Sequence, residues 1–267
     1  MHNTDSLDTL CAALCTAMGV TPPNNAAKAN DRLLKYVSDT LDEKKLDRIF
    51  MYNPDAIADW IYRKYSKLLS TVSDRCDFEL PLRTVMPSVT PVCFGTMYTG
   101  AQPEVHGIRA YVKPVIKIDT IFDAMIRAGK RVAIVSTAGD SMSKIYLERD
   151  MDYFIYPTIE EVNAKAAELI IENRHDFIAV YNGNYDALMH KFGPESVEAL
   201  AELRANARTF GIFDSLIRTC WKNERTLVGF AMDHGCHEID GACGSHGLDM
   251  DEDINITHLY KIHDTAE

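Results

Sequence analysis

The sequence predicts an α/β fold in which helices sandwich a central, mostly parallel sheet. Three observations support this prediction. Short β-type runs alternate with helical patterns along most of the chain. The helix–glycine–strand succession over 119–137 is typical of α/β proteins. Asp or His residues also follow the ends of three separate strand runs, and in open parallel sheets ligands gather at that edge.

Composition narrows the class of protein. The 267 residues fit one large α/β domain, and the hydrophobic content of 46% is that of a globular chain. The net charge of −11 disfavours a nucleic-acid polymer or an anionic membrane as partner, because both require a basic surface. No apolar run approaches the roughly 20 residues that span a bilayer. No secretory signal is recognisable, and the seven scattered cysteines indicate free thiols, so we expect a cytoplasmic protein.

Two helices are predicted before the first core strand. Apolar residues recur at helical spacing over 5–19, and TPPNN at 21–25 ends that pattern. A second helix is expected over 30–42. We assign residues 1–45 to a helical N-terminal extension. Its position outside the core suggests the hypothesis that it is a dimerisation arm, which would make the protein a homodimer.

The core elements follow in order. LDRIFMYN (46–53) is a β-type run, and a helical pattern covers 56–69, so Asp55 falls at their junction. Thr90 and Pro91 open a short helix that a glycine closes, since threonine suits an N-cap and proline the first helical position. An irregular linker is expected at 101–117, helices at 119–128, 159–173 and 194–221, and strands at 131–137, 151–157, 177–183 and 226–232, which is the last clear apolar strand.

Carboxylates, imidazoles and one hydroxyl stand at the predicted strand ends. The candidate metal ligands are Asp55, Thr90, Asp186, His190, Asp233, His234 and His246. Asp186 and His190 are four residues apart, so both point the same way on a helical turn. This donor set suits Zn²⁺ or a similar borderline metal, and Mn²⁺ or iron accepts similar ligands.

The ligands divide between two divalent ions. One ion takes Asp186, His190 and His246. The other takes Asp55, Asp233, His234 and the oxygen of Thr90. The ions are expected roughly 3.5–4 Å apart, as in other two-metal sites. Thr90 is the predicted catalytic nucleophile, because a bound metal and a helix N-terminus both lower the pKa of its hydroxyl, and attack on phosphorus gives a phospho-threonine intermediate.

These residues lie in motifs that resemble the alkaline phosphatase superfamily, and within it the type I phosphodiesterase/nucleotide pyrophosphatase branch. The motifs are PSVTPVCFGTMYTGAQPEVHGI, YDALMHKFGPES, DHG and GSHG, in the family's order. The resemblance implies an alkaline phosphatase-like fold and a two-zinc hydrolase of phosphate mono- or diesters. It makes residues 46–267 an α/β metallohydrolase domain whose partner is a small anionic phosphate-ester substrate.

Three departures from the family pattern bear on the site. The family's first aspartate usually precedes glycine, whereas here it stands in YNPDAI. The asparagine that follows HGI in the family is absent from HGIRAYVKP, which leaves Tyr111 or Lys113 to bind the substrate oxyanion. The chain also leaves little room for a large cap. Cys93 is followed by FGT rather than by the sulfatase pattern, which disfavours that branch.

Several functions remain open at this stage. Phosphodiesters or nucleotides are the first expected substrates and phosphomonoesters the second. A phosphonate hydrolase and a phosphomutase would use the same metal architecture. A non-catalytic metal- or nucleotide-binding relative is the rival from another class, motivated by YNPDAI and the missing asparagine. The plainest alternative at the residue level is that Asp55 and Thr90 serve only as helix caps.

Overall fold

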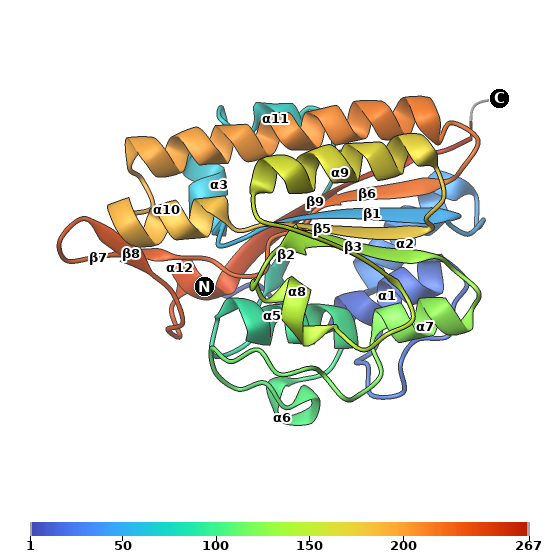
Figure 1. Ribbon diagram of the computed structural model, residues 1–267, viewed down its shortest axis with the longest axis horizontal. Coiled ribbons are helices and arrows are strands. Elements are labelled where there is room, and N and C mark those ends of the chain that lie inside the picture. Colours follow the sequence, from blue (N-terminus) through green and yellow to red (C-terminus); the bar gives the residue numbers. More distant parts are fainter. Residues whose placement is uncertain (1, 266–267) are drawn as a thin grey trace.

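The computed structural model describes residues 2–265. Its central seven-stranded sheet has the order β2-β9-β6-β1-β5-β3-β4 (Figure 1). The strands are β1 (Arg48–Pro54), β2 (Phe78–Arg83), β3 (Val132–Thr137), β4 (Asp152–Tyr156), β5 (Phe177–Asn182), β6 (Thr226–Phe230) and β9 (Asn255–His263). Within this sheet β9 alone runs against its neighbours, so the predicted α/β class with a mostly parallel sheet is confirmed. A separate hairpin consists of β7 (His237–Ile239) and β8 (Cys243–Ser245).

Helices cover both faces of the sheet (Figure 1). One face carries α9 (Ile159–Glu172) and α11 (Val197–Cys220), and the other carries α1 (Thr9–Ala17), α5 (Thr90–Thr99), α7 (Ile121–Arg127) and α8 (Met142–Ile145). The remaining helices are α2 (Asp31–Leu41), α3 (Asp59–Lys64), α4 (Ser70–Ser73), α6 (Pro103–His106), α10 (Asn184–Phe192) and α12 (Asp251–Ile254). Within residues 2–265, none of these helices combines the length and the apolar character that crossing a bilayer requires.

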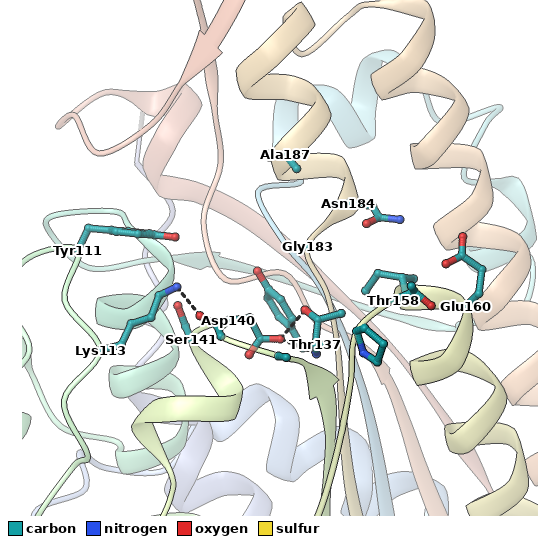
Figure 2. A pocket seen from close by; sticks show the side chains of 15 residues that line it. Tyr111, Lys113, Thr137, Asp140, Ser141, Thr158, Glu160, Gly183, Asn184 and Ala187 are labelled. Carbon is teal, nitrogen blue, oxygen red and sulfur yellow. Dashed lines mark hydrogen bonds between the residues drawn. The ribbon is translucent and has the colours of Figure 1, made fainter.

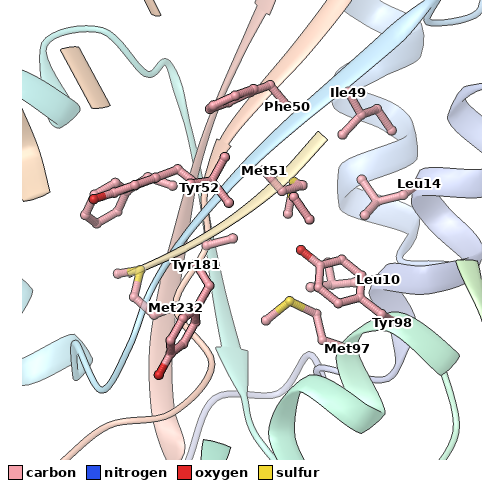
Figure 3. Close-up of a cluster of buried hydrophobic side chains, with 14 of the residues drawn as sticks. Leu10, Leu14, Ile49, Phe50, Met51, Tyr52, Met97, Tyr98, Tyr181 and Met232 are labelled. Atoms are coloured by element: carbon pink, nitrogen blue, oxygen red, sulfur yellow. The ribbon is translucent and has the colours of Figure 1, made fainter. Parts of the chain in front are cut away.

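The central strands are apolar on both sides because both sides are covered. Successive side chains of β1 point to opposite faces, as a strand requires. Ile49 lies on the side of Leu14 from α1, while the ring of Phe50 packs 5.3 Å from that of Phe213 in α11 (Figure 3). This packing fixes the position of β1, whose carboxyl end carries the first candidate ligand.

The N-terminal helices pack against the same body. Leu10 and Leu14 of α1 are fully buried in the common hydrophobic core, and α1 contacts α5 and α7. Ser6 forms a parallel bridge with Arg83 of β2. α1 and α2 lie inside the ranges expected for the first two helices. The domain boundary after residue 45 and the dimerisation arm stay predictions.

Several elements differ from those expected. The strands β2 and β9 were not predicted, and β9 follows the last clear apolar strand, which lies within 226–232 as expected. The reason is that β9 is buried on both faces with polar Thr257 and His258 among its buried residues, so neither alternation nor an apolar run marks it. The continuous helix expected over 56–69 is also wrong, because a turn after α3 replaces helical hydrogen bonding before α4 begins.

Candidate metal centre

The parallel strands β1, β5 and β6 end at one edge of the sheet, and this edge brings the candidate ligands together. The backbone N–H of Asp55 donates to Asn182 O at 2.9 Å, which extends the β1–β5 pairing by one residue. Ala56 then turns the chain with a φ of 61°, and its N–H donates to Asp233 Oδ1 at 3.2 Å. Asp55 is therefore no helix cap, since Ala58 precedes α3. Ala56 occupies a left-handed conformation that glycine adopts without strain.

Thr90 is the first residue of α5, and Val89 is the N-cap. The expected N-cap role of Thr90 is thus wrong, and no side chain caps this helix. Its hydroxyl instead donates to Asp55 Oδ2 at 3.3 Å and lies 3.3 Å from His234 Nε2. The threonine is 2% exposed. Its oxygen is therefore held among charged side chains and not used for local helix structure.

Six of the seven candidate ligands, the aspartates and histidines, form two adjoining groups, and Thr90 contacts the first of them through Asp55 and His234. In the first, ligand atoms of Asp55, Asp233 and His234 all lie within 4.8 Å of one another. In the second, the same holds for Asp186, His190 and His246. The rings of His234 and His246 stack with centroids 4.1 Å apart, so the two groups touch. Both groups have the membership that the sequence analysis assigned to the two ions, while metal binding itself stays a prediction.

Each histidine is turned so that Nε2 faces the carboxylates. Nδ1 of His234 is 2.9 Å from Gly235 O, Nδ1 of His246 is 2.9 Å from Ser88 O, and Nδ1 of His190 is 3.0 Å from Gly244 O. A carbonyl partner requires a proton on Nδ1, which leaves the Nε2 lone pair free. Such Nδ1–carbonyl hydrogen bonds fix the tautomer and the ring orientation of metal-binding histidines.

Three buried carboxylate oxygens face these nitrogens without accepting a hydrogen bond from any described residue: Asp55 Oδ1, Asp186 Oδ1 and Asp233 Oδ2. Nε2 of His234 lies 3.2 Å from Asp55 Oδ1, and Nε2 of His246 lies 3.4 Å from Asp186 Oδ1. Buried anionic oxygens that are left unpaired in this way are costly unless a cation neutralises them. The donor set therefore fits divalent metal ions.

The pKa shifts point the same way. Burial and the nearby charge of Asp186 raise the pKa of Asp55 to about 7, and burial beside Asp55 raises the pKa of Asp233 well above its usual value. Burial also lowers the pKa of His234 to about 3, which keeps this imidazole neutral. Burial opposes ionisation of Asp186 too, but the imidazoles of His190 and His246 hold its pKa below the usual range. Crowded carboxylates of this kind are stabilised when a cation displaces their protons.

A cleft of about 650 Å³ adjoins the metal centre. Tyr111 and Lys113 lie on one side of it, and Thr158 and Glu160 lie on the opposite side (Figure 2). Tyr111 is 59% exposed, and Lys113 Nζ donates to Gly139 O at 2.9 Å. Tyr181 lines the cleft and donates from its hydroxyl to Asp55 Oδ2, so it joins the cleft to the metal centre.

The sequence analysis missed the far wall of this cleft. Thr158, Glu160 and Asn184 follow the carboxyl ends of β4 and β5, which bring them to the edge where the metal centre lies. The sequence pattern places Tyr181 only within a core strand. Its position near the end of that strand, two residues before a glycine, was the one available signal.

Solved structures share the fold of this chain, whereas sequence comparisons find no relative. No family profile and no curated protein matches the sequence. Among solved structures, human ectonucleotide pyrophosphatase/phosphodiesterase 5 superposes with a TM-score of 0.58 at 15% identity, over 72% of this chain and 58% of that one. The chain has an alkaline phosphatase-like fold. The predicted resemblance to the nucleotide pyrophosphatase branch is thus confirmed at the level of fold.

Two further structures share this alkaline phosphatase-like fold. An inactive variant of murine ectonucleotide pyrophosphatase/phosphodiesterase 5 in complex with AMP superposes with a TM-score of 0.56 at 16% identity, over 73% of this chain and 59% of that one. Phosphonoacetate hydrolase from Sinorhizobium meliloti 1021 in complex with phosphonoformate has a TM-score of 0.55 at 21% identity, over 74% of this chain and 59% of that one. The present chain spans less than two thirds of the length of these proteins.

Proposed function

We propose that the protein is a metal-dependent phosphoric ester hydrolase with two divalent ions, zinc being the first expectation. The observation that supports it is the convergence of three buried carboxylate oxygens that accept no hydrogen bond with three histidine Nε2 atoms, beside the Thr90 hydroxyl that contacts Asp55 and His234. The likeness in fold to a phosphodiesterase and to a phosphonate hydrolase supports the same reaction class. A cytoplasmic location and a homodimer remain part of the proposal.

Thr90 is the proposed nucleophile. Its Oγ1 attacks phosphorus, the P–O bond to the alcohol or nucleotide leaving group breaks, and a phospho-threonine forms. The proton of Oγ1 passes to Asp55 Oδ2, to which this hydroxyl already donates, and the departing oxygen takes up a proton from solvent. Water then cleaves the new P–O bond and regenerates Thr90. Two bound cations would lower the pKa of the attacking oxygen and neutralise the phosphoryl oxygens.

The cleft beside this centre is the proposed site for the rest of the substrate. Its walls carry hydroxyl, amide and charged groups, which suit a polar leaving group. Tyr111 and Lys113 are the proposed substrate-binding residues, in place of the asparagine that the resemblance implies. A phosphodiester or nucleotide is the first substrate class to test, and a phosphomonoester or phosphonate the second.

The test combines elemental analysis with assays on p-nitrophenyl phosphate, bis-p-nitrophenyl phosphate and a phosphonate. Wild-type protein should hold two divalent ions and hydrolyse at least one of these compounds. Thr90→Ala should lower kcat by roughly 10³-fold or more, as loss of a nucleophile does. Thr99→Ala removes another buried hydroxyl of α5, one that bonds to Gly95 O, and should leave kcat unchanged.

Two outcomes would decide against the hydrolase. Two bound ions without hydrolysis of any ester would favour the non-catalytic metal-binding rival. Equal kcat for Thr90→Ala and the wild type would show that Thr90 is not the nucleophile. A phosphosugar isomerisation assay would detect a phosphomutase.

A further inference from the structure

Tyr181 connects three parts of the proposed active site. It lies near the carboxyl end of β5, one residue before the carbonyl that accepts from Asp55 N. Its ring packs edge-on against Phe94 of α5, with centroids 5.7 Å apart and an interplanar angle of 77°. Figure 3 shows it on the far side of the core cluster from Leu14. The side chain of Tyr181 in β5 thus contacts Asp55, the residue that follows β1, and also the helix that begins with Thr90.

The contact with Asp55 divides the two oxygens of that carboxylate. Oδ2 accepts from the hydroxyls of Tyr181 and Thr90. Oδ1 accepts no hydrogen bond from the described residues and faces His234 Nε2 at 3.2 Å. A carboxylate anchored through one oxygen in this way presents the other in a fixed direction.

Gly183 provides the space that the hydroxyl of Tyr181 occupies. A Cβ atom at position 183 would lie 2.7 Å from this hydroxyl oxygen, which is closer than a carbon side chain tolerates. The φ of Gly183 is −94°, so the backbone itself would accept alanine. The glycine is therefore required by the tyrosine hydroxyl and not by the turn.

We propose that Tyr181 is a positioning residue of the metal centre: its hydroxyl anchors Asp55 through Oδ2, so that Oδ1 points at an ion, and Gly183 keeps that hydroxyl in place. This inference rests on the proposed function, because it assumes that the group of Asp55, Asp233 and His234 binds a cation. It assigns a role to two residues that supply no ligand themselves.

The experiment measures Zn²⁺ affinity of metal-free protein by competition with a chelator. Tyr181→Phe should weaken the binding of one of two ions about 10- to 100-fold, the usual effect of losing an outer-shell partner. The matched control is Tyr98→Phe, which removes another buried hydroxyl, one that donates to Asn53 Oδ1 at 2.8 Å. That control should bind both ions as the wild type does.

Gly183→Ala gives an independent test without removing any polar group. Its methyl group should displace the Tyr181 hydroxyl from Asp55 and weaken the same ion. In the Tyr181→Phe background the alanine should add little, because the atom that it displaces is already gone. Such non-additivity is expected only when two residues act through one contact.

The outcomes separate this proposal from the proposed function. Wild-type protein that binds no Zn²⁺ would overturn both. Wild-type protein that binds two ions, with Tyr181→Phe and Tyr98→Phe indistinguishable from it, would overturn the positioning role alone. If Tyr181→Phe does not fold, Gly183→Ala decides, and unchanged affinity in that variant overturns the role. Additive losses in the double variant would remove Gly183 from the proposal.

Discussion

At the scale of single residues, the proposed metal centre contains polar side chains that cap no helix. The hydroxyl of Thr90 caps no helix, and Asp55 precedes no helix directly. Both are nearly inaccessible to water, with exposed fractions of 2% and 1%. Burying such groups is costly, so their convergence is better explained by a ligand than by folding.

The first prediction concerns Ala56, whose φ of 61° is a left-handed conformation. Ala56→Val should lower the free energy of unfolding of the metal-free protein by about 1–3 kcal/mol, because a β-branched residue is strained there. Ala56→Gly should keep the metal-binding capacity, since glycine adopts this φ freely. Urea denaturation in the presence of a chelator measures the stability of both variants. An Ala56→Val variant as stable as the wild type would contradict the strained turn.

The second prediction concerns Lys113 at the rim of the cleft. Lys113→Ala should lower kcat/KM for phosphate esters by roughly 10- to 100-fold, the worth of one hydrogen bond to a charged group. Lys117→Ala is the matched control, because that lysine is paired with Glu148 on the surface. Steady-state kinetics at saturating metal provide the measurement. Equal losses in the two variants would point to general charge and not to substrate contact.

Residue types and order were sufficient to predict which aspartates and histidines lie together, while their binding of metal stays a prediction. Asp186 and His190 share a helical turn, and Asp233 follows an apolar strand, so both positions could be inferred without coordinates. Tyr181 could not be recognised in this way. Its role depends on where a tyrosine hydroxyl at the end of β5 lies relative to β1, and periodicity carries no such information.

At the scale of elements, the hairpin of β7 and β8 supports one half of the centre. β8 packs on α10, which carries Asp186 and His190, and the chain after β8 carries His246. Asp253 holds the turn that follows β8, because it accepts a hydrogen bond from Leu248 N at 2.8 Å. It also lies 2.7 Å from Nδ1 of His237, the first residue of β7. These contacts bring a ligand from the hairpin segment to ligands on a helix.

The third prediction tests this contact. A Cβ atom at Gly244 would lie 2.3 Å from Met189 Sδ and 2.8 Å from Met189 O. Gly244→Ala should therefore push β8 from α10 and weaken the ion of Asp186, His190 and His246 by about 10-fold or more, while the other ion is retained. Ser245→Ala, the next residue of β8, is the control. Zn²⁺ titration of metal-free protein would show one weakened step, and two equally weakened steps would contradict a local effect.

The element scale is also where prediction from sequence was least complete. The strands that carry ligands are central and apolar, so their apolar runs indicate them. The hairpin strands have three residues each, and β9 mixes polar and apolar residues on two buried faces, so neither shows a period. Their places depend on long-range pairing that only the folded chain specifies.

At the scale of the whole molecule, the proposed metal centre should couple folding to metal binding. Strands β1, β5 and β6 deliver three aspartates to one edge of the sheet, and no described residue neutralises all of them. An ion that binds the folded chain and not the unfolded one stabilises it by about 2.7 kcal/mol at a concentration 100 times Kd. Removing metal should therefore lower the melting temperature markedly.

The last prediction concerns how the stability of the protein, with and without metal, changes with pH. In metal-free protein the pKa of Asp55 is raised from 3.8 to about 7, so the folded chain holds a proton that the unfolded chain releases. Stability from such a group is complete below pH 4 and is lost as pH rises through about 7. The pKa values of His190 and His246 are also raised, so these residues likewise contribute stability that is lost as pH rises above 6.5, the usual histidine pKa. The lowered pKa values of His234, His106 and His258 act oppositely below 6.5, because the unfolded imidazoles then bind protons that the buried ones exclude. The lowered pKa of Asp186 also acts oppositely, but only in more acidic solution.

Calorimetry above about pH 6.5, where the buried neutral histidines no longer bind protons in the unfolded chain, should thus show opposite trends in chelator and in Zn²⁺. In chelator the melting temperature should fall as pH rises, and Asp55→Asn, which cannot titrate, should flatten that fall. With Zn²⁺ the stabilisation should grow with pH, because the ligands must lose their protons to bind the ion. Parallel curves with and without Zn²⁺ would show that these carboxylates and imidazoles do not exchange protons for a metal, and the two-ion centre would then be excluded.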